Sequence, residues 1–363
     1  MRQNNLLKIL FLTLFWVCAA VFIVLYDSVV LITDVERLTG TVISVDILAN
    51  LGIVVVVTIL AGGAIAACEV LYLNNLLRRR PLGLALLLKT AFYVTNICIF
   101  TTLAILFIAA DQLDQGLLHE TSLRLVAKYM LGLRGVMTIA YWSIAVMSAL
   151  FVLQVSEKLG QGVLLSFLLG RYHRPREETR IFLFMDLKSS TAYAEQLGHM
   201  KYSQLIQDCF ADLTETVVRH NAQIYQYVGD EVVLTWSLRK GLANANCLAA
   251  FFDYDRTLRA RQRYYRATYG VMPEFKAGLN LGHVMVAEVG QLKKELAYHG
   301  DALNTAARIQ EKCNEFLKKL LVSEPLRDAL PEQSTFDFHT VGVLQLKGKE
   351  QPVSVYEAVE VSK

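Results

Sequence analysis

Two aspartates, each at the end of an apolar run, are the residues of this chain best placed to do chemistry. Asp186 closes the run IFLFMD, and Asp230 follows Gly229 in the segment YVGDE. A short strand that ends in an acid directs its carboxylate beyond the sheet edge, and Gly229 permits a tight hairpin turn that presents Asp230. Two such strands side by side would bring the carboxylates together, which is repulsive unless divalent cations lie between them. Paired carboxylates on hard metal ions suit phosphoryl chemistry on a nucleotide.

Later segments carry groups that suit phosphate. In GDALNTAAR, Asp301 is the expected N-cap of a helix, and Asn304 and Arg308, four residues apart, share one face near its start. A guanidinium at such a place suits a phosphate oxyanion. Lys347 in LKGK, on a late strand, is a candidate for a second phosphate contact, and the backbone N–H groups of the helix start at Ser189, just past Asp186, are a candidate for a third. Each feature alone also fits an ordinary cap, turn or surface charge; their combination favours a nucleotide site.

As a set, these residues resemble the class III nucleotidyl cyclases, in the membrane-bound bacterial type with an N-terminal transmembrane bundle. The resemblance covers about residues 180–360 and is carried, in the family's order, by FMDLKSST, YVGDE, FKAGLNLGHV, GDALNTAARI and LKGKEQPVSVYEA. Asp186 and Asp230 are 44 positions apart, close to the family's usual interval, and Arg308 follows Asn304 at the usual offset of four. Several motifs in the right order are far more specific than any one of them.

The resemblance implies an adenylyl cyclase that converts ATP to cyclic AMP and pyrophosphate. Asp186 and Asp230 would bind two Mg²⁺ or Mn²⁺ ions per site, and the ribose 3′-OH would attack the α-phosphorus in line. Asn304 would position the ribose, Arg308 would stabilise charge on the α-phosphate, and Lys347 would bind the outer phosphates. The metal-binding pair and the Asn/Arg pair of one site come from different protomers in this family, so a head-to-tail homodimer with two sites is implied.

Two positions depart from the family's pattern. The residues that read the base lie four before the second metal aspartate and seven before the asparagine, and here they are Gln226 and Ala297. Neither the Lys with Asp or Thr of many adenylyl cyclases nor the Glu with Cys of many guanylyl cyclases is present. Gln226 can donate and accept and so could read either purine, whereas the Ala297 side chain forms no hydrogen bond. Lys276, Glu295 or backbone groups could compensate. A guanylyl or dual-specificity cyclase therefore stays an alternative to the adenylyl cyclase.

The pattern of the C-terminal half predicts how these residues are positioned. Strands are expected at 180–187, 222–228, 232–236, 274–281, 283–289, 319–322, 340–346 and 353–359, with helices at 199–220, 242–269 and 301–317. Helices that alternate with mostly antiparallel strands predict an α+β sandwich. Its opening order, βαββαβ, is ferredoxin-like.

The N-terminal half is predicted to be an all-α transmembrane bundle of four helices. The chain has 363 residues, of which 54% are hydrophobic and 19% charged, with a mean hydropathy of +0.37, values too apolar for an ordinary soluble enzyme. Four segments, 6–30, 51–73, 84–109 and 136–155, are long enough to span a lipid bilayer of ~30 Å. The net charge of +3 gives no reason to expect a nucleic-acid partner. The six cysteines have no metal-ligand spacing and are expected to be reduced thiols.

Basic residues near the spans indicate the orientation. They lie before or at the start of the first span, between the second and third, and after the fourth: Arg2, Lys8, Arg78, Arg79, Arg80, Arg171, Arg174, Arg176 and Arg180. The positive-inside rule then places both termini and the catalytic domain in the cytoplasm of a multi-pass inner (plasma) membrane protein. Glu69 and Lys89 fall inside spans two and three, where a simple ion pair or snorkelling is the favoured interpretation over a functional site.

The expected domains are residues 1–155 (four-helix membrane domain), 156–178 (coupling helix and linker) and 179–363 (catalytic domain). The coupling helix is expected to continue from span four to about Gly170, with Pro175 ending it. Its position suggests a route for an upstream signal that the sequence does not identify. From a different class, a non-catalytic nucleotide-sensing receptor module remains an alternative, although such a module would be expected to have a damaged metal or phosphate set.

Overall fold

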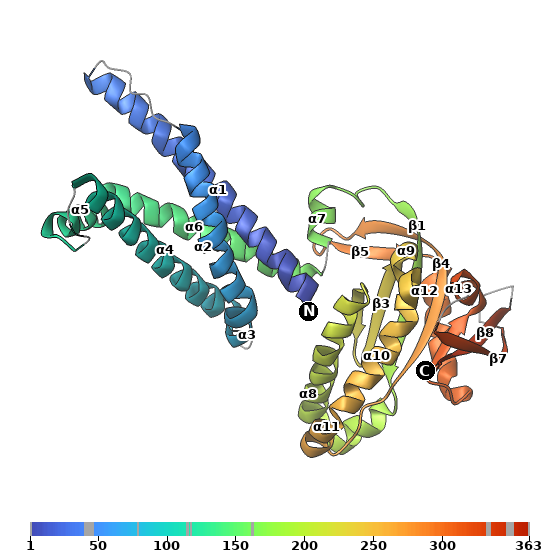
Figure 1. The fold of residues 1–363 in the computed structure, drawn as a ribbon. Coiled ribbons are helices and arrows are strands. Elements are labelled where there is room, and N and C mark those ends of the chain that lie inside the picture. Colours follow the sequence, from blue (N-terminus) through green and yellow to red (C-terminus); the bar gives the residue numbers. More distant parts are fainter. Residues whose placement is uncertain are drawn as a thin grey trace. The chain divides into compact units, whose positions relative to one another are not determined.

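The computed structural model describes residues 2–39, 47–77, 80–113, 116, 118–160, 163–331, 335–345 and 352–361. The described chain divides into two compact units, which we call the N-terminal unit (Arg2–Lys158) and the C-terminal unit (from Leu159) (Figure 1).

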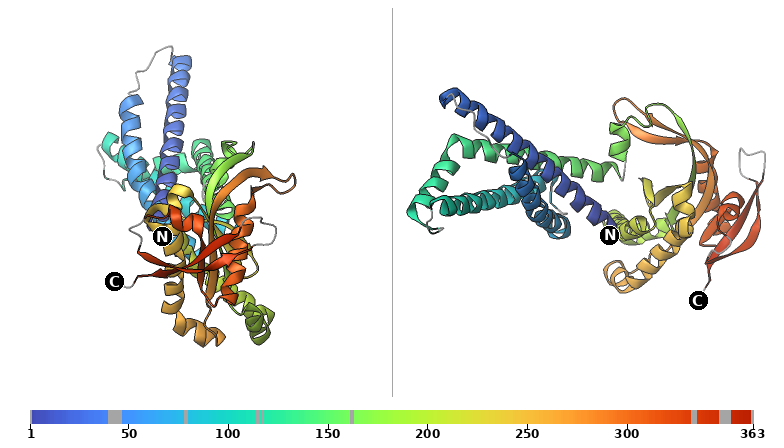
Figure 2. Two further views of the ribbon diagram at one scale, coloured as in Figure 1. Left: turned by 90° about the vertical axis from the view of Figure 1, so that its right-hand side faces the viewer. Right: turned by 45° about the horizontal axis from the view of Figure 1, so that its top comes forward.

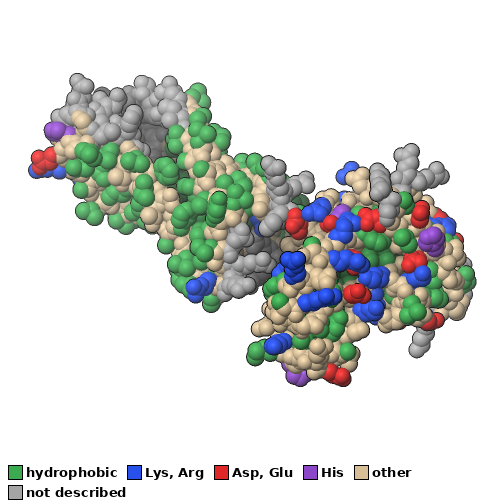
Figure 3. Space-filling view, turned by 60° about the horizontal axis from the view of Figure 1, so that its bottom comes forward, with side chains coloured by type: hydrophobic (Ala, Val, Ile, Leu, Met, Phe, Trp, Pro, Cys, Tyr) green, Lys and Arg blue, Asp and Glu red, His purple; other side chains and the backbone are tan. Residues whose placement is uncertain are grey.

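The secondary structure of the N-terminal unit is helical, with short non-helical connections, in its described residues. Its elements are α1 (Arg2–Thr39), α2 (Ile47–Cys68), the π-helix η1 (Glu69–Leu73), α3 (Asn74–Leu77), α4 (Leu82–Leu113), α5 (Glu120–Leu131) and α6 (Leu133–Leu159). Four stretches are long and apolar enough to cross a membrane: Asn5–Tyr26, Val54–Leu73, Gly83–Leu103 and Gly135–Ser156. Green hydrophobic side chains form an extended surface on this unit (Figure 3), as expected of helices whose solvent is lipid. The four long apolar helices expected in the N-terminal half are thus confirmed.

Aromatic residues form the centre of the bundle. Trp16 of α1 packs against Tyr93 of α4 and Trp142 of α6, with ring centroids 5.3 and 6.1 Å apart, and the Tyr141 hydroxyl donates to the Ala19 carbonyl at 2.9 Å. The two intramembrane charges are paired, as expected, because Lys89 Nζ lies 2.6 Å from Glu69 Oε1 and both side chains are buried.

The connector differs from its prediction. Helix α6 ends at Leu159, Gly160 has a φ of +95°, and α7 is a separate short helix (Val163–Leu168) followed by turns. The positive φ at Gly160 is incompatible with a continuous helix. The expected helix through Gly170, ended by Pro175, is therefore wrong, since helical structure stops before Pro175 is reached.

An eight-stranded sheet forms the centre of the C-terminal unit, in the order β2-β3-β1-β4-β6-β8-β7, with β5 paired to β4. Its elements are β1 (Arg176–Leu187), α8 (Ser190–Arg219), β2 (Gln223–Val228), β3 (Glu231–Ser237), α9 (Leu238–Leu242), η2 (Ala243–Ala245), α10 (Asn246–Ala260), α11 (Gln262–Tyr269), β4 (Phe275–Val289), β5 (Glu295–His299), α12 (Asp301–Glu315), β6 (Leu320–Ser323), α13 (Glu324–Ala329), β7 (Phe336–Leu344) and β8 (Val353–Glu360). The first four strands have the ferredoxin-like order, so the predicted α+β fold is confirmed.

The two faces of the sheet have different coverings. Alternate residues of β1, among them Ile181, Leu183 and Met185, enter a large core with the helices α8, α10 and α11. The other set, Phe182 and Phe184, packs against α12. The two turned views in Figure 2 allow both layers to be followed. The period-two alternation of a strand thus assigns Asp186, two residues after Phe184, to the α12 face.

Several predicted elements need correction. Residues 274–281 and 283–289 form one continuous strand, β4, because Gly282 continues the ladder with β1 and does not turn. The predicted helix 242–269 is several pieces, with Asn244 and Ala245 in left-handed conformations. Strand β5 and helix α13 were not predicted, and α8 begins at Ser190, nine residues before the predicted start, with Gly198 non-helical within it.

Candidate functional site

Asp186 stands at the end of β1 between two neighbouring strands. In the antiparallel ladders its Cα partners are Glu231 of β3 and Lys276 of β4. Its side chain is half-buried, and its Oδ2 lies 3.3 Å from Lys276 Nζ. The backbone of Asp186 is therefore held on one side by β3 and on the other by β4.

Asp230 occupies the turn between β2 and β3, beside Asp186. Gly229 has a φ of +62°, the left-handed conformation expected for this hairpin. The Asp230 carboxyl is close enough to raise the pKa of Asp186, and its own Oδ2 is buried without a hydrogen-bond partner among the described residues. The structure thus brings the two predicted carboxylates together.

Two residues around Asp186 were not assigned to a metal site from the sequence. Gln310 of α12 is buried and donates from Nε2 to Asp186 Oδ2 at 3.3 Å. Lys276, which the sequence suggested as a base-reading residue, instead forms the ion pair with Asp186. The sequence held one indication of this role for Gln310. It lies two residues after Arg308, which places it on the opposite, sheet-facing side of the helix.

The site carries more negative than positive charge. Burial first, and then the charge of Asp230, raises the pKa of Asp186, while Lys276 lowers it. Burial, followed by the charges of Asp186 and Asp230, raises the pKa of Glu231 to about 7. With Glu311, which also raises the pKa of Glu231, the carboxyl groups outnumber the one ammonium of Lys276, and this imbalance makes a proton or a cation favourable here.

These features fit a hard divalent cation. The two carboxylates are adjacent, and one buried oxygen of Asp230 has no hydrogen-bond partner among the described residues. Proteins usually bind Mg²⁺ with one or two carboxylates, and water and substrate phosphates supply the other ligands. No cluster of three or more His, Cys, Asp or Glu side chains in the described part of the chain forms a fuller ligand set. The two aspartates would therefore leave most coordination positions to water, backbone or substrate oxygens.

Helix α12 lies directly on β4 because glycines allow it. A Cβ at Gly278 would be 2.3 Å from the backbone nitrogen of Gln310, and a Cβ at Gly282 would be 2.7 Å from Ala302 Cβ. Asn280, between them, donates to the Ala302 carbonyl at 3.0 Å. The predicted N-cap at Asp301 is wrong: Gly300 is the cap residue, and Asp301, the first helical residue, accepts a hydrogen bond from the Thr305 hydroxyl at 3.1 Å.

Asn304 and Arg308 lie on one side of α12, as predicted. At about 100° per residue, Asn304 is about 120° and Arg308 about 160° around the helix from Gln310. Gln310 faces the sheet and is buried, whereas Asn304 is exposed and Arg308 half-buried. Within one chain, the side of α12 that carries Gln310 therefore faces the Asp186/Asp230 pair, and Asn304 and Arg308 are on a different side of the helix.

The base-reading positions lie on two different strands. Gln226 is exposed on β2, next to a bulge in the β2–β3 ladder, and Ala297 is half-buried on β5 opposite Ala287. Their neighbours Tyr225 and Tyr298 are in contact, with ring centroids 4.9 Å apart. Glu295 is paired with Lys293. Lys347 lies outside the described residues.

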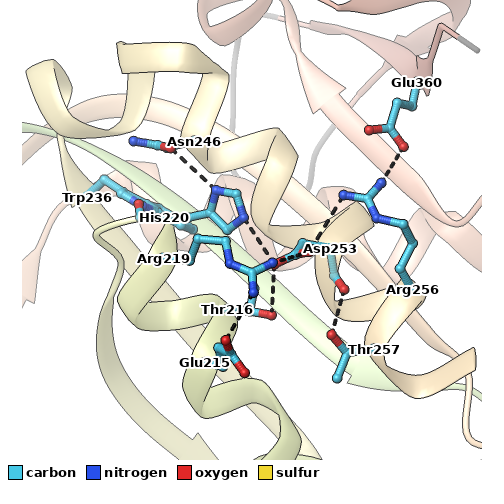
Figure 4. Close-up of polar contacts among 10 residues, drawn as sticks. All are labelled: Glu215, Thr216, Arg219, His220, Trp236, Asn246, Asp253, Arg256, Thr257 and Glu360. Atoms are coloured by element: carbon cyan, nitrogen blue, oxygen red, sulfur yellow. Dashed lines mark hydrogen bonds and ion pairs between the residues drawn. The ribbon is translucent and has the colours of Figure 1, made fainter. Parts of the chain in front are cut away.

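A separate polar network fixes α8 to α10 away from this site (Figure 4). Both oxygens of Asp253 accept from Arg219 at 2.9 Å, and His220 Nε2 lies 3.3 Å from Oδ2. Trp236 donates to the His220 carbonyl at 2.9 Å, and Arg256 links the network to Glu360 of β8. Its groups satisfy one another, so we assign it a structural role.

Comparisons with known proteins agree with this geometry. The sequence profile of the "Adenylate and Guanylate cyclase catalytic domain" family matches residues 172–357, just over half of the chain. "Adenylate cyclase 2" of Rhizobium meliloti (strain 1021) is 35% identical over 206 residues, which are 57% of this chain and 57% of that protein. "Adenylate cyclase 1" of the same strain is 26% identical over 186 residues, 49% of this chain and 27% of that protein. The chain thus spans less than two thirds of either relative's length.

The fold also has solved counterparts. A bacterial light-regulated adenylyl cyclase superposes with a TM-score of 0.53 at 20% identity, covering 62% of this chain and 66% of that chain. At this level of identity the likeness concerns the fold.

Proposed function

Because this chain belongs to the adenylate and guanylate cyclase catalytic-domain family, we propose that it is a membrane-anchored adenylyl cyclase that makes cyclic AMP and pyrophosphate from ATP. The observation that carries the proposal is the adjacency of Asp186 and Asp230, with one buried Asp230 oxygen that has no partner among the described residues. The 35% identical relative is named an adenylate cyclase, which favours ATP as the substrate.

Asp186 and Asp230 would hold two Mg²⁺ or Mn²⁺ ions per site. When bound, such ions neutralise the triphosphate and lower the pKa of the attacking ribose hydroxyl. The protein's own contribution is to keep the two carboxylates in place, through the ladders of β1 and through the contacts of Asp186 with Lys276 and Gln310. A bound cation would take the place of the Lys276 ammonium as the positive charge beside Asp186.

Asn304, Arg308 and Lys347 would act on the substrate. Asn304 holds the ribose, and Arg308 stabilises the charge that develops on the α-phosphate during in-line attack. Lys347 binds the outer phosphates. Removing one such electrostatic group typically costs on the order of 10²–10³ in rate.

A homodimer completes each site. On one copy of α12, Gln310 faces the carboxylates while Asn304 and Arg308 are turned about 120–160° away. A substrate bound to the metal ions of one chain would therefore be contacted by Asn304 and Arg308 of a second chain. In a two-fold symmetric pair this exchange is reciprocal and gives two sites.

The substrate base is read by few side-chain groups. Gln226 offers one amide on an exposed strand position, and Ala297 offers none. Lys276 and Glu295 have ion-pair partners, so neither is a ready replacement. This observation favours modest purine selectivity and keeps a guanylyl or dual-specificity cyclase as the second candidate.

The N-terminal unit would anchor the enzyme in the inner (plasma) membrane with four spans and both termini in the cytoplasm. The support is the four apolar helices and the basic residues near their predicted cytoplasmic ends. In this position the unit could also pass on an upstream signal.

The test is product analysis by chromatography, with purified full-length protein, Mn²⁺ and either ATP or GTP. Cyclic AMP as the main product supports the proposal. Cyclic GMP or a mixture would retain the mechanism and change the substrate. A folded dimer that forms no cyclic product would instead favour a nucleotide-sensing module.

A further inference from the structure

Strand β2 changes the alternation of its side chains at a bulge. Ile224 is paired with Leu234 of β3, and the next pair is Gln226 with Val233, so Tyr225 is an extra residue. Leu234 belongs to the core that α8 helps to form, whereas Val233 belongs to the cluster with α12. Gln226 therefore lies on the α12 face of the sheet. In a strand without the bulge, the same residue would lie on the α8 face.

The residue after Gln226 has the orientation that this change of face requires. Tyr227 contacts Phe210 of α8, with ring centroids 4.6 Å apart, so it lies on the α8 face. Its neighbour Gln226 consequently points to the opposite face. Strand β2 is the outer strand of the sheet order, and Gln226 is exposed there. The bulge thus presents the Gln226 amide to solvent on the α12 face.

Two tyrosines hold the bulge. The ring of Tyr225, the extra residue, lies edge to face with the ring of Tyr298 of β5, at a centroid distance of 4.9 Å. Tyr298 also packs edge to face with Phe182 of β1, at 5.4 Å. Strands β2 and β5 are not neighbours in the sheet, since β2 pairs with β3 and β5 with β4. The tyrosine contact is therefore a direct link between the bulge and β5.

A buried arginine fixes Tyr298 in turn. Arg180 of β1 is 4% exposed, and its guanidinium carbon lies 4.9 Å from the centre of the Tyr298 ring. Its nitrogens Nε, Nη1 and Nη2 donate to Thr235 of β3, Glu178 of β1 and Gln223 of β2. A guanidinium holds its donors in one rigid plane. Arg180 therefore sets the position of the Tyr298 ring together with that of Gln223, the first residue of β2.

We propose that Arg180, Tyr298 and Tyr225 are positioning residues for purine recognition, because they hold the bulge that directs the Gln226 amide toward the substrate base. This proposal rests on the cyclase function proposed above. The amide of Gln226 can donate and accept, and so can pair with the edge of either purine. Since the Ala297 side chain forms no hydrogen bond, the direction of Gln226 decides whether this side-chain contact with the base exists.

The experiment is a double-mutant cycle on the full-length protein in lipid nanodiscs. The kcat and KM of cyclic nucleotide formation are measured with Mn²⁺ and either ATP or GTP, and the Kd is measured with the fluorescent mant derivatives of both. Gln226→Ala should lower the affinity and kcat/KM for the preferred nucleotide about three- to tenfold, the worth of roughly one hydrogen bond. In a Tyr298→Leu background the same substitution should have less than a twofold effect, because the amide is already misdirected.

Matched backgrounds separate positioning from stability. Tyr298→Phe keeps the ring and should retain the full effect of Gln226→Ala. Arg180→Lys keeps the charge but cannot hold all partners at once, so it should reduce that effect. Phe252→Leu removes a comparable contact, 5.3 Å from the ring of Phe336 on β7, at the other end of the sheet order. This control should lower stability and leave the effect of Gln226→Ala unchanged.

Tyr225→Leu is the second background for the cycle, and it replaces Tyr298→Leu if that variant does not fold. A single gel-filtration peak and retained helicity establish folding. If the wild type binds nucleotide without turnover, the same cycle is evaluated from Kd.

Two results would overturn this proposal while the cyclase stands. One is a full effect of Gln226→Ala in both leucine backgrounds, and the other is no effect of Gln226→Ala in a wild type that binds nucleotide. A wild type that binds neither nucleotide and forms no cyclic product would refute the cyclase function, and this proposal with it.

Discussion

Gln310 of α12 donates a hydrogen bond to Asp186 of β1 across 3.3 Å. This contact turns the sheet-facing side of α12 toward the carboxylates, and it consequently turns Asn304 and Arg308 away from them. The same helix thus supports the metal-binding half of the proposed site in its own chain and presents the other half outward. The proposed homodimer rests on this relationship.

Asp230→Asn should remove the stabilisation of the C-terminal unit by Mn²⁺. The substitution leaves the turn at Gly229 intact but takes away one of two adjacent carboxylates. In the wild type, Mn²⁺ at about a hundredfold excess over its Kd should add about 2.7 kcal/mol to the free energy of unfolding. The measurement is hydrogen-exchange protection of the β1 peptide 176–187 with and without Mn²⁺. Asp255→Asn on α10 is the control, and an equal Mn²⁺ effect in Asp230→Asn would remove that residue from the metal site.

Glu231 should make the metal-free C-terminal unit less stable as the pH rises. Its pKa is raised from an ordinary value of 4.5 to about 7 in the folded chain. Between these values the folded chain holds a proton that the unfolded chain has released, so the free energy of unfolding falls with increasing pH. The raised pKa of Asp186 acts in the same direction.

Glu231→Gln should flatten this pH dependence. The measurement is protection of the β1 peptide at pH values from 4.5 to 8 in the presence of a chelator, with intrinsic exchange rates corrected for pH. A slope that is unchanged in Glu231→Gln would show that the titrating group is another residue.

Gly278→Ala should separate α12 from the sheet. The new Cβ would lie 2.3 Å from the Gln310 nitrogen and 2.6 Å from the Ala306 carbonyl oxygen, both backbone atoms. Overpacking of this kind costs about 1–3 kcal/mol, and the helix that shifts carries both Gln310 and Arg308. We expect lower thermal stability and a large loss of cyclase activity. Gly342→Ala, where nothing lies within 4 Å of the new Cβ, is the control, and equal behaviour of the two variants would contradict this account.

Much of this architecture could be predicted because local pattern and turn chemistry decided it. The apolar periodicity indicated β1, and the Gly229 turn indicated the hairpin that presents Asp230. The bend at Gly160, the uninterrupted strand through Gly282 and the bulge beside Gln226 could not be predicted in this way. Tertiary contacts decide the uninterrupted strand, because Gly282 is needed for the approach of α12 and not for a turn.

The same limit applies to the candidate site. Asp186 and Asp230 were found from their positions at strand ends, whereas Gln310 and the ion pair of Lys276 depend on which helix lies over which strand. A buried polar residue on a helix gives no signal of its partner in the sequence alone.

Asp253→Ala should destabilise the C-terminal unit without a direct effect on the nucleotide site. Asp253 is 7% exposed and accepts from Arg219, while His220 and Arg256 lie nearby. Because the two arginines are about half exposed and can be solvated again, we expect a loss of about 1–3 kcal/mol.

Urea unfolding followed by the fluorescence of Trp236, in a Trp16→Phe/Trp142→Phe background, measures this loss. Asp255→Ala is the matched control, since its pairing with Arg259 is an i,i+4 surface contact worth less than about 1 kcal/mol. A loss in Asp253→Ala no larger than in Asp255→Ala would mean that the network does not stabilise the fold.

The most direct test of the shared cyclase site is complementation between two inactive variants. Asp230→Asn and Arg308→Ala should each abolish cyclic AMP formation as homodimers. A mixed dimer has one site with both halves intact, so random pairing should restore about a quarter of the wild-type activity. Cyclic AMP at that level from the co-expressed pair, and none from either variant alone, is the predicted result. A mixed dimer that forms but stays inactive, or wild-type activity in either single variant, would contradict the account.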